Sequence, residues 1–138
     1  AIQEAIYSGN SSRIQDLIHN LLLQSASSFD TVGENFYHGF MLGLCAMLSG
    51  SYTTSNRESG EGRYDLQMEP KDHKLPGIIV ELKAEKNGSK ESLTKLSQTA
   101  LQQINDRKYD TEMRSRGIHT IYKYGVAFSG KDVVVTVG

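Results

Sequence analysis

The segment Gly77-Ile78-Ile79-Val80-Glu81-Leu82-Lys83 changes from apolar to charged within a few residues. Its β-branched run predicts a strand, and because side chains repeat every second residue along a strand, Glu81 and Lys83 share one face. A carboxylate and an ammonium group at the edge of the core need a partner or a metal, since burial of an isolated charge is costly. The alternative is an exposed cross-strand ion pair, because Glu-x-Lys alone is a common pattern.

A second carboxylate, Asp65, interrupts the segment from Arg63 to Met68, which alternates in character as a strand does. Aspartate is disfavoured in strands, so its presence here calls for a reason. If the two strands are neighbours, Asp65 and Glu81 supply two carboxylates to one hard divalent cation, which prefers oxygen ligands. The alternative is an aspartate on a solvent-facing surface or at a β-bulge.

The elements that must position these side chains follow from the periodicity of the sequence. Helices are expected at about residues 14–22, with an N-cap at Ser11 or Ser12, at about 31–48, and from about Ser89 onward. Strands are expected at 52–55, 63–68, 77–83, 118–128 and 133–137. The order predicts an α/β fold with a central mixed β-sheet flanked by α-helices, and the apolar strand at 77–80 in a central position covered on both faces.

Length and composition favour one domain over residues 1–138, with a helical lead-in at 1–29 and a core at 30–138. No apolar run approaches the roughly 20 residues that a membrane span needs, and the N-terminus carries no secretory signal pattern. The single cysteine, Cys45, excludes an internal disulfide, and a cytoplasmic setting is the default expectation. The four histidines are too far apart in the sequence to indicate a zinc site.

The charge distribution bears on nucleic-acid binding. The net charge is −1, and all Lys and Arg residues except Arg13 follow residue 56, where they alternate with acidic residues. This mixed-charge half is no basic stripe, so any affinity for nucleic acid is expected to be modest and sensitive to salt.

About fifteen residues after Asp65 comes Glu81-Leu82-Lys83, at the end of an apolar strand and before a helix. This pattern resembles the PD-(D/E)xK nuclease superfamily. Further motifs in the same order resemble one branch of it, the mostly uncharacterised bacterial domains usually found C-terminal to an AAA-ATPase-like domain. These motifs are Glu34 to Gly39, Gly62-Arg63-Tyr64-Asp65, Gln102-Gln103-Ile104, Tyr109, and Tyr124 to Lys131. The resemblance implies a restriction-endonuclease-like core with the element order αβββαβ.

The resemblance also implies roles for individual residues. Asp65 and Glu81 would bind Mg²⁺ or Mn²⁺, assisted by the backbone carbonyl of Leu82. Lys83 would position or activate the attacking water, and Gln103 would steady the metal site or the phosphate. Gln103 has an alternative role as a boundary residue hydrogen-bonded to the backbone.

Glu34 would be the helix acid that completes the metal site, while Glu58 and Arg63 would support the site from outside it. The residues themselves offer another role, since Thr31-x-x-Glu34 is a capping box in which Glu34 reaches back to the start of its own helix. Its helical spacing to Tyr37 nevertheless places Glu34 toward the core.

The expected function is therefore a divalent-metal-dependent nuclease that hydrolyses DNA or RNA phosphodiester bonds by direct attack of water, with DNA ahead of RNA as the substrate. The implied partners are nucleic acid, an AAA-ATPase-like domain in a longer parent chain, and a second copy in a homodimer. The competing hypothesis is a non-catalytic, nuclease-like module that binds nucleic acid or a protein beside an ATPase domain. The near-neutral charge favours the module, and the complete set of acids with Lys83 favours the enzyme.

Overall fold

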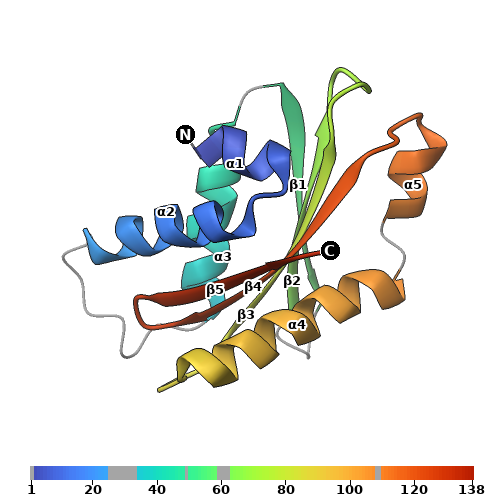
Figure 1. Ribbon diagram of the computed structural model, residues 1–138. Helices are drawn as coiled ribbons and strands as arrows, with labels where there is room; N and C mark the ends of the chain where they lie inside the picture. The colour runs from blue at the N-terminus through green and yellow to red at the C-terminus, as the bar shows by residue number, and fades with distance from the viewer. Residues whose placement is uncertain (1, 25–33, 49, 59–62, 108–109) are drawn as a thin grey trace.

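The computed structural model describes residues 2–24, 34–48, 50–58, 63–107 and 110–138, and only the backbone at 34–35, 56–58, 63–64 and 107. These residues form three helices, three strands, two helices and two strands, in that order (Figure 1). The helices are α1 (Ile2–Ser8), α2 (Ser11–Leu23), α3 (Glu34–Ala46), α4 (Lys90–Arg107) and α5 (Asp110–Ser115). The strands are β1 (Ser51–Glu58), β2 (Arg63–Pro70), β3 (Gly77–Ala84), β4 (Ile121–Ser129) and β5 (Asp132–Val137).

The five strands form one mixed sheet in the order β1-β2-β3-β4-β5. β3 and β4 are parallel and are joined through α4, whereas the other neighbouring pairs are antiparallel. The strand β3 is the middle one, and its first six residues are all buried. The predicted α/β class, the core order αβββαβ and the central place of the apolar strand are thus confirmed.

Helices cover both faces of the sheet, with α1, α2 and α3 on one side and α4 and α5 on the other (Figure 1). The alternation of side chains divides each strand between the two layers. The even-numbered residues of β3 join the large apolar core under α1 to α3, together with Leu66, Tyr37 and Phe128. The odd-numbered Ile79 belongs to a smaller cluster under α4 and α5.

The helix α4 begins with a reciprocal cap. Ser89 Oγ accepts a hydrogen bond from the Ser92 backbone N–H at 3.1 Å, and Ser92 Oγ accepts one from the Ser89 N–H at 2.9 Å. Ser92 Oγ also donates to Glu85 Oε1 at 2.6 Å, so the cap is tied to the residue that follows β3. The helix start expected near Ser89 is confirmed.

The two N-terminal helices meet at Gly9, whose φ of +73° suits a residue without a side chain. The expected N-cap of α2 at Ser11 or Ser12 was wrong. Asn10 caps this helix instead, because its side-chain oxygen accepts the Arg13 N–H at 3.2 Å.

The strand β5 lies at one edge of the sheet, and α2 is attached along it. Gln15 Oε1 accepts the backbone N–H of Val135 at 3.0 Å, and His19 Nδ1 lies 2.9 Å from the carbonyl oxygen of Lys131. The side chains of α2 therefore bond to backbone groups that β4 does not use.

The bounds of β1, β2 and β4 differ from those expected, and one helix was missed. Ile118 lies before β4 rather than within it and is buried in the cluster under α4 and α5. The short helix α5 was not predicted, because six residues give too little periodicity to detect. No helix in the described part of the chain is long and apolar enough to cross a bilayer.

Candidate functional site

Asp65 and Glu81 lie directly opposite each other on β2 and β3, as Cα partners in an antiparallel pair. Partners of this kind place their side chains on the same face, with Cβ atoms about 5 Å apart. That face is the one covered by α4, because the residues on either side of Glu81 belong to the core on the opposite face. The two carboxylate-bearing residues are only 5% and 1% exposed. The sequence hypothesis of two carboxylates on neighbouring strands therefore matches the observed register.

Lys83 follows two residues after Glu81, so it lies on the same face, and its side chain is partly buried. Leu82, between them, points into the opposite core and is 1% exposed. Its side chain thus serves packing, and only its backbone is available to the site.

The helix α4 passes unusually close to the sheet beside Glu81. Gly125 of β4 is the Cα partner of Glu81, and a Cβ atom added there would lie 2.0 Å from the backbone oxygen of Ser97. No side chain fits between the helix and this strand, so Gly125 allows α4 to approach the central strands. A sequence signal for this role exists, since glycine inside an apolar strand often marks a close backbone approach, but the partner helix could not be inferred.

Gln103 lies on the flank of α4 that is turned toward β3 rather than β5. The other flank faces β5, because Ser97 Oγ lies 2.6 Å from Thr136 Oγ1 and Leu101 packs near Gly138. Gln103 comes two residues after Leu101, and residues two apart on a helix point about 200° apart, in nearly opposite directions. Gln103 therefore points away from β5. Its Oε1 atom is buried and makes no hydrogen bond with any residue that the structure describes.

Glu34 begins α3, on the opposite face of the sheet from α4. The first turn of α3 is fixed by Tyr37, whose ring stacks on Phe128 with centroids 4.4 Å apart and whose hydroxyl donates to the Gly130 carbonyl at 2.8 Å. Burial raises the pKa of Tyr37, so this hydroxyl stays protonated. The side chain of Glu34 lies outside the described residues, so its metal role and its capping role both stay predictions.

The other supporting residues expected from the sequence, Glu58 and Arg63, also have side chains outside the described part of the chain. The structure thus brings Asp65, Glu81 and Lys83 to one face, which α4 covers, and turns Gln103 of α4 away from β5.

The donor set fits a hard divalent cation. Two carboxylates and an amide oxygen are the ligand types that Mg²⁺ accepts, and this ion commonly uses one or two carboxylates while keeping water and substrate oxygens as its other ligands. Among the side chains described, no group of three or more His, Cys, Asp or Glu residues is arranged to hold a metal. Any ion held between Asp65 and Glu81 would therefore need further oxygen ligands from water, the backbone, a substrate or a side chain outside the described residues, such as that of Glu34.

The loop after β3 is braced against β4. The backbone N–H of Gly88 donates to Ser129 Oγ at 2.8 Å, and the N–H of Glu85 donates to the Phe128 carbonyl at 2.9 Å. Ser129 is itself buried. These bonds hold the strand end that carries Lys83 in a constant position relative to β4.

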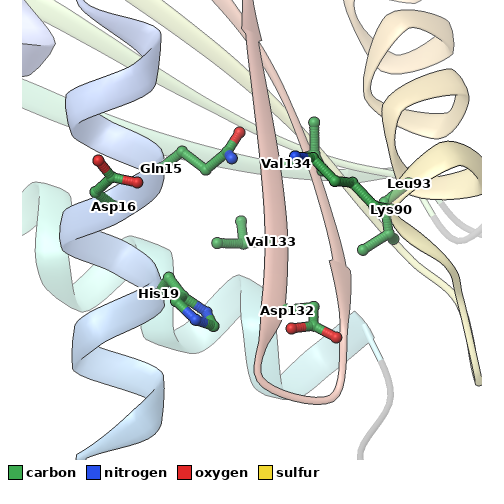
Figure 2. A pocket seen from close by; sticks show the side chains of 8 residues that line it. All are labelled: Gln15, Asp16, His19, Lys90, Leu93, Asp132, Val133 and Val134. Atoms are coloured by element: carbon green, nitrogen blue, oxygen red, sulfur yellow. The ribbon is translucent and has the colours of Figure 1, made fainter.

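A separate pocket of about 240 Å³ opens at the far edge of the sheet (Figure 2). Gln15, Asp16 and His19 of α2 line one side, Lys90 and Leu93 of α4 line the other, and β5 runs between them. None of the predicted site residues lines this pocket, and Asp65 lies on β2, three strands away from β5. The pocket is distinct from the carboxylate pair.

Comparison with known proteins gives one finding. The sequence model of the PD-(D/E)XK nuclease superfamily matches residues 32–137, a span that begins just before α3 and includes the whole sheet. No curated protein matched the chain.

Proposed function

Because this chain belongs to the PD-(D/E)XK nuclease superfamily, we propose that it is a divalent-metal-dependent nuclease that hydrolyses DNA or RNA phosphodiester bonds. The observation that carries the proposal is the pairing of Asp65 with Glu81 on the two central strands, both buried, with Lys83 on the same face. DNA is the proposed first substrate. We propose further that residues 1–138 act as one domain, beside an ATPase-like domain of a longer chain or as a homodimer.

The residues would divide the work by their chemistry. The carboxylates of Asp65 and Glu81, with the Leu82 carbonyl, would hold Mg²⁺ or Mn²⁺, and a bound divalent ion supplies positive charge that stabilises the phosphate as it is attacked. The Lys83 ammonium would donate a hydrogen bond to the attacking water and orient it toward phosphorus. Gln103 would hold a water or a phosphate oxygen at the α4 side of the pair, and Glu34 would complete the ligand set.

The test is cleavage of labelled single-stranded DNA, duplex DNA and RNA by the wild-type chain with Mg²⁺, Mn²⁺ or EDTA. Metal-dependent cleavage should fall by about 1,000-fold or more in Glu81→Gln, because one ligand of the ion is lost, and by about 100-fold or more in Lys83→Ala. Glu91→Gln is the matched control, since Glu91 is an exposed acid in the first turn of α4. Equal cleavage by wild type and Glu81→Gln would rule out the proposed site.

A second candidate function is a non-catalytic module that binds nucleic acid or a protein beside an ATPase. The near-neutral net charge of −1 favours it, because independent nucleases usually present a stronger basic surface. This module would show no cleavage with any substrate and no stabilisation by either metal, although it would still bind its partner.

A further inference from the structure

The sheet face that carries Asp65 continues beyond α4. The helix α4 packs on β3, β4 and β5, and α5 packs at the start of β3, so no described helix makes more than slight contact with the same face of β1 and of the far half of β2. The residues that point outward there include Tyr52 and Thr54 on β1, and Gln67 and Glu69 opposite them on β2. This open surface, defined by Tyr52, Thr54, Gln67 and Glu69, leads along β2 to Asp65.

Tyr52 is the main apolar feature of the open surface. It is 65% exposed, and Lys71 Nζ lies over one face of its ring, 5.0 Å from the ring centre. A large exposed ring with a cation over one face can bind a nucleobase by stacking on its other face, while the cation attracts the adjoining phosphate. Tyr52 is the partner of Glu69, which comes four residues after Asp65 on β2. At the usual strand rise, Tyr52 therefore lies about 13 Å along the strand direction from Asp65.

The charge of the open surface is compatible with a polyanion. Its one acid, Glu69, is neutralised by the Arg116 guanidinium, which bonds to both carboxylate oxygens, at 2.8 Å and 3.0 Å from Nε. Lys71 then leaves the surface with a net positive charge near Tyr52. Thr54 and Gln67 add polar groups along the path to Asp65 without adding charge.

We propose that this open surface binds single-stranded nucleic acid and leads it to the carboxylate pair, with one unpaired base stacked on Tyr52. The proposal rests on the proposed nuclease function and deepens it by naming the substrate class. A single strand is favoured over a duplex because the bases of a duplex already stack on one another and offer no free face to the ring. Stacking also supplies affinity that a chain of near-neutral charge lacks.

The test is binding of short fluorescent oligonucleotides, measured by anisotropy in EDTA so that no metal-dependent cleavage occurs. Single-stranded DNA, single-stranded RNA and duplex DNA are compared on the full chain. Tyr52→Ala should weaken single-strand binding by about 5-fold to 100-fold, the usual range for loss of one stacked base, and should leave duplex binding within about 2-fold. Tyr52→Phe should bind like the wild type, because the ring is kept.

Two further variants separate stacking from charge and from non-specific effects. Lys71→Gln should make single-strand binding less sensitive to salt. The slope of log affinity against log salt concentration should become less steep by somewhat under one. Met47→Ala is the control, because Met47 is 83% exposed just after α3, the helix on the opposite face, and its removal should change no affinity. Thermal melting of each variant should match the wild type, since Tyr52 and Met47 are both exposed.

The inference is overturned if Tyr52→Ala binds single strands as tightly as the wild type, or if the wild type prefers duplex. Either result would leave metal-dependent cleavage, and thus the proposed nuclease, unaffected. Conversely, loss of single-strand binding in Tyr52→Ala with no cleavage by any variant would support the surface and reject the nuclease.

Discussion

The two faces of the sheet are built from different kinds of residue. The face under α1, α2 and α3 is a continuous apolar core, and the buried side chains described there are hydrophobic. The face under α4 has two smaller apolar clusters, with Asp65, Glu81 and Lys83 on the same side of the strands. Buried acids stabilise little and cost much. We therefore expect the apolar face to supply most of the free energy of folding, while the other face holds the charged residues of the candidate site.

The largest difference in stability should be between substitutions of two adjacent residues of β3, Leu82 and Glu81, whose side chains lie on opposite faces of the sheet. Leu82→Ala should lower the free energy of unfolding by about 2–5 kcal/mol, because it leaves a cavity in the continuous core. Glu81→Gln should leave it unchanged or raise it by about 1 kcal/mol in EDTA, since it removes the repulsion between two adjacent carboxylates. Urea unfolding measures both variants. An equal loss in both would mean that the faces do not divide stability and chemistry.

Metal binding should stabilise the protein through the carboxylate pair of Asp65 and Glu81. At a free concentration of 100 times its Kd, Mg²⁺ or Mn²⁺ should add about 2.7 kcal/mol to the free energy of unfolding. Asp65→Asn should remove most of this gain, whereas Glu91→Gln, an exposed acid on α4, should retain it. Thermal melting with and without metal provides the measurement, and an equal shift in wild type and Asp65→Asn would place the metal elsewhere.

A pair of glycine substitutions compares how closely helices approach the two faces. Gly125→Ala should cost about 1–3 kcal/mol, because its Cβ atom would lie 2.0 Å from the Ser97 carbonyl and α4 would have to move. Gly43→Ala in α3 should instead add about 0.5–1 kcal/mol, since nothing lies within 4 Å of the new methyl group and alanine favours helix. Chemical denaturation of the two variants tests this, and a stabilised Gly125→Ala would disprove the close approach.

The smallest effect concerns Asp110, the first residue of α5. A hydrogen bond from Arg114 is the main cause that holds the pKa of Asp110 below its usual value, with Lys123 adding to it. Because the pKa is lowered in the folded state, the ion pair contributes above the unfolded pKa of about 3.9 and is lost as the pH falls through the folded value. Asp110→Asn should therefore reduce stability by less than about 1 kcal/mol at pH 7 and by nothing near pH 2. Thermal melting at the two pH values measures the difference, and a constant difference would contradict it.

Local patterns were enough to predict much of the α4 face. The β-branched run ending at Val80 predicted the central strand, and the period of two placed Glu81 and Lys83 together. The helix beginning near Ser89 followed from the helical spacing of its apolar residues. These features depend on neighbours in the chain, so they are visible in the sequence.

Features that depend on distant residues could not be predicted in this way. The exact pairing of Asp65 with Glu81 depends on the register of two strands, and the role of Gly125 depends on a helix that crosses it. The helix α5 is stabilised by tertiary contacts, such as Met113 packing against Gly77, rather than by its own six residues.

The attachment of α2 along β5 has a consequence for self-association. An edge strand rich in valine, such as β5, offers free backbone groups on which another chain can assemble into a growing fibril. The Gln15 amide occupies the N–H of Val135, in the middle of that edge, and His19 holds the Lys131 carbonyl at its start. The helix α2 thus covers part of the edge on which another chain could add a strand, besides covering the core.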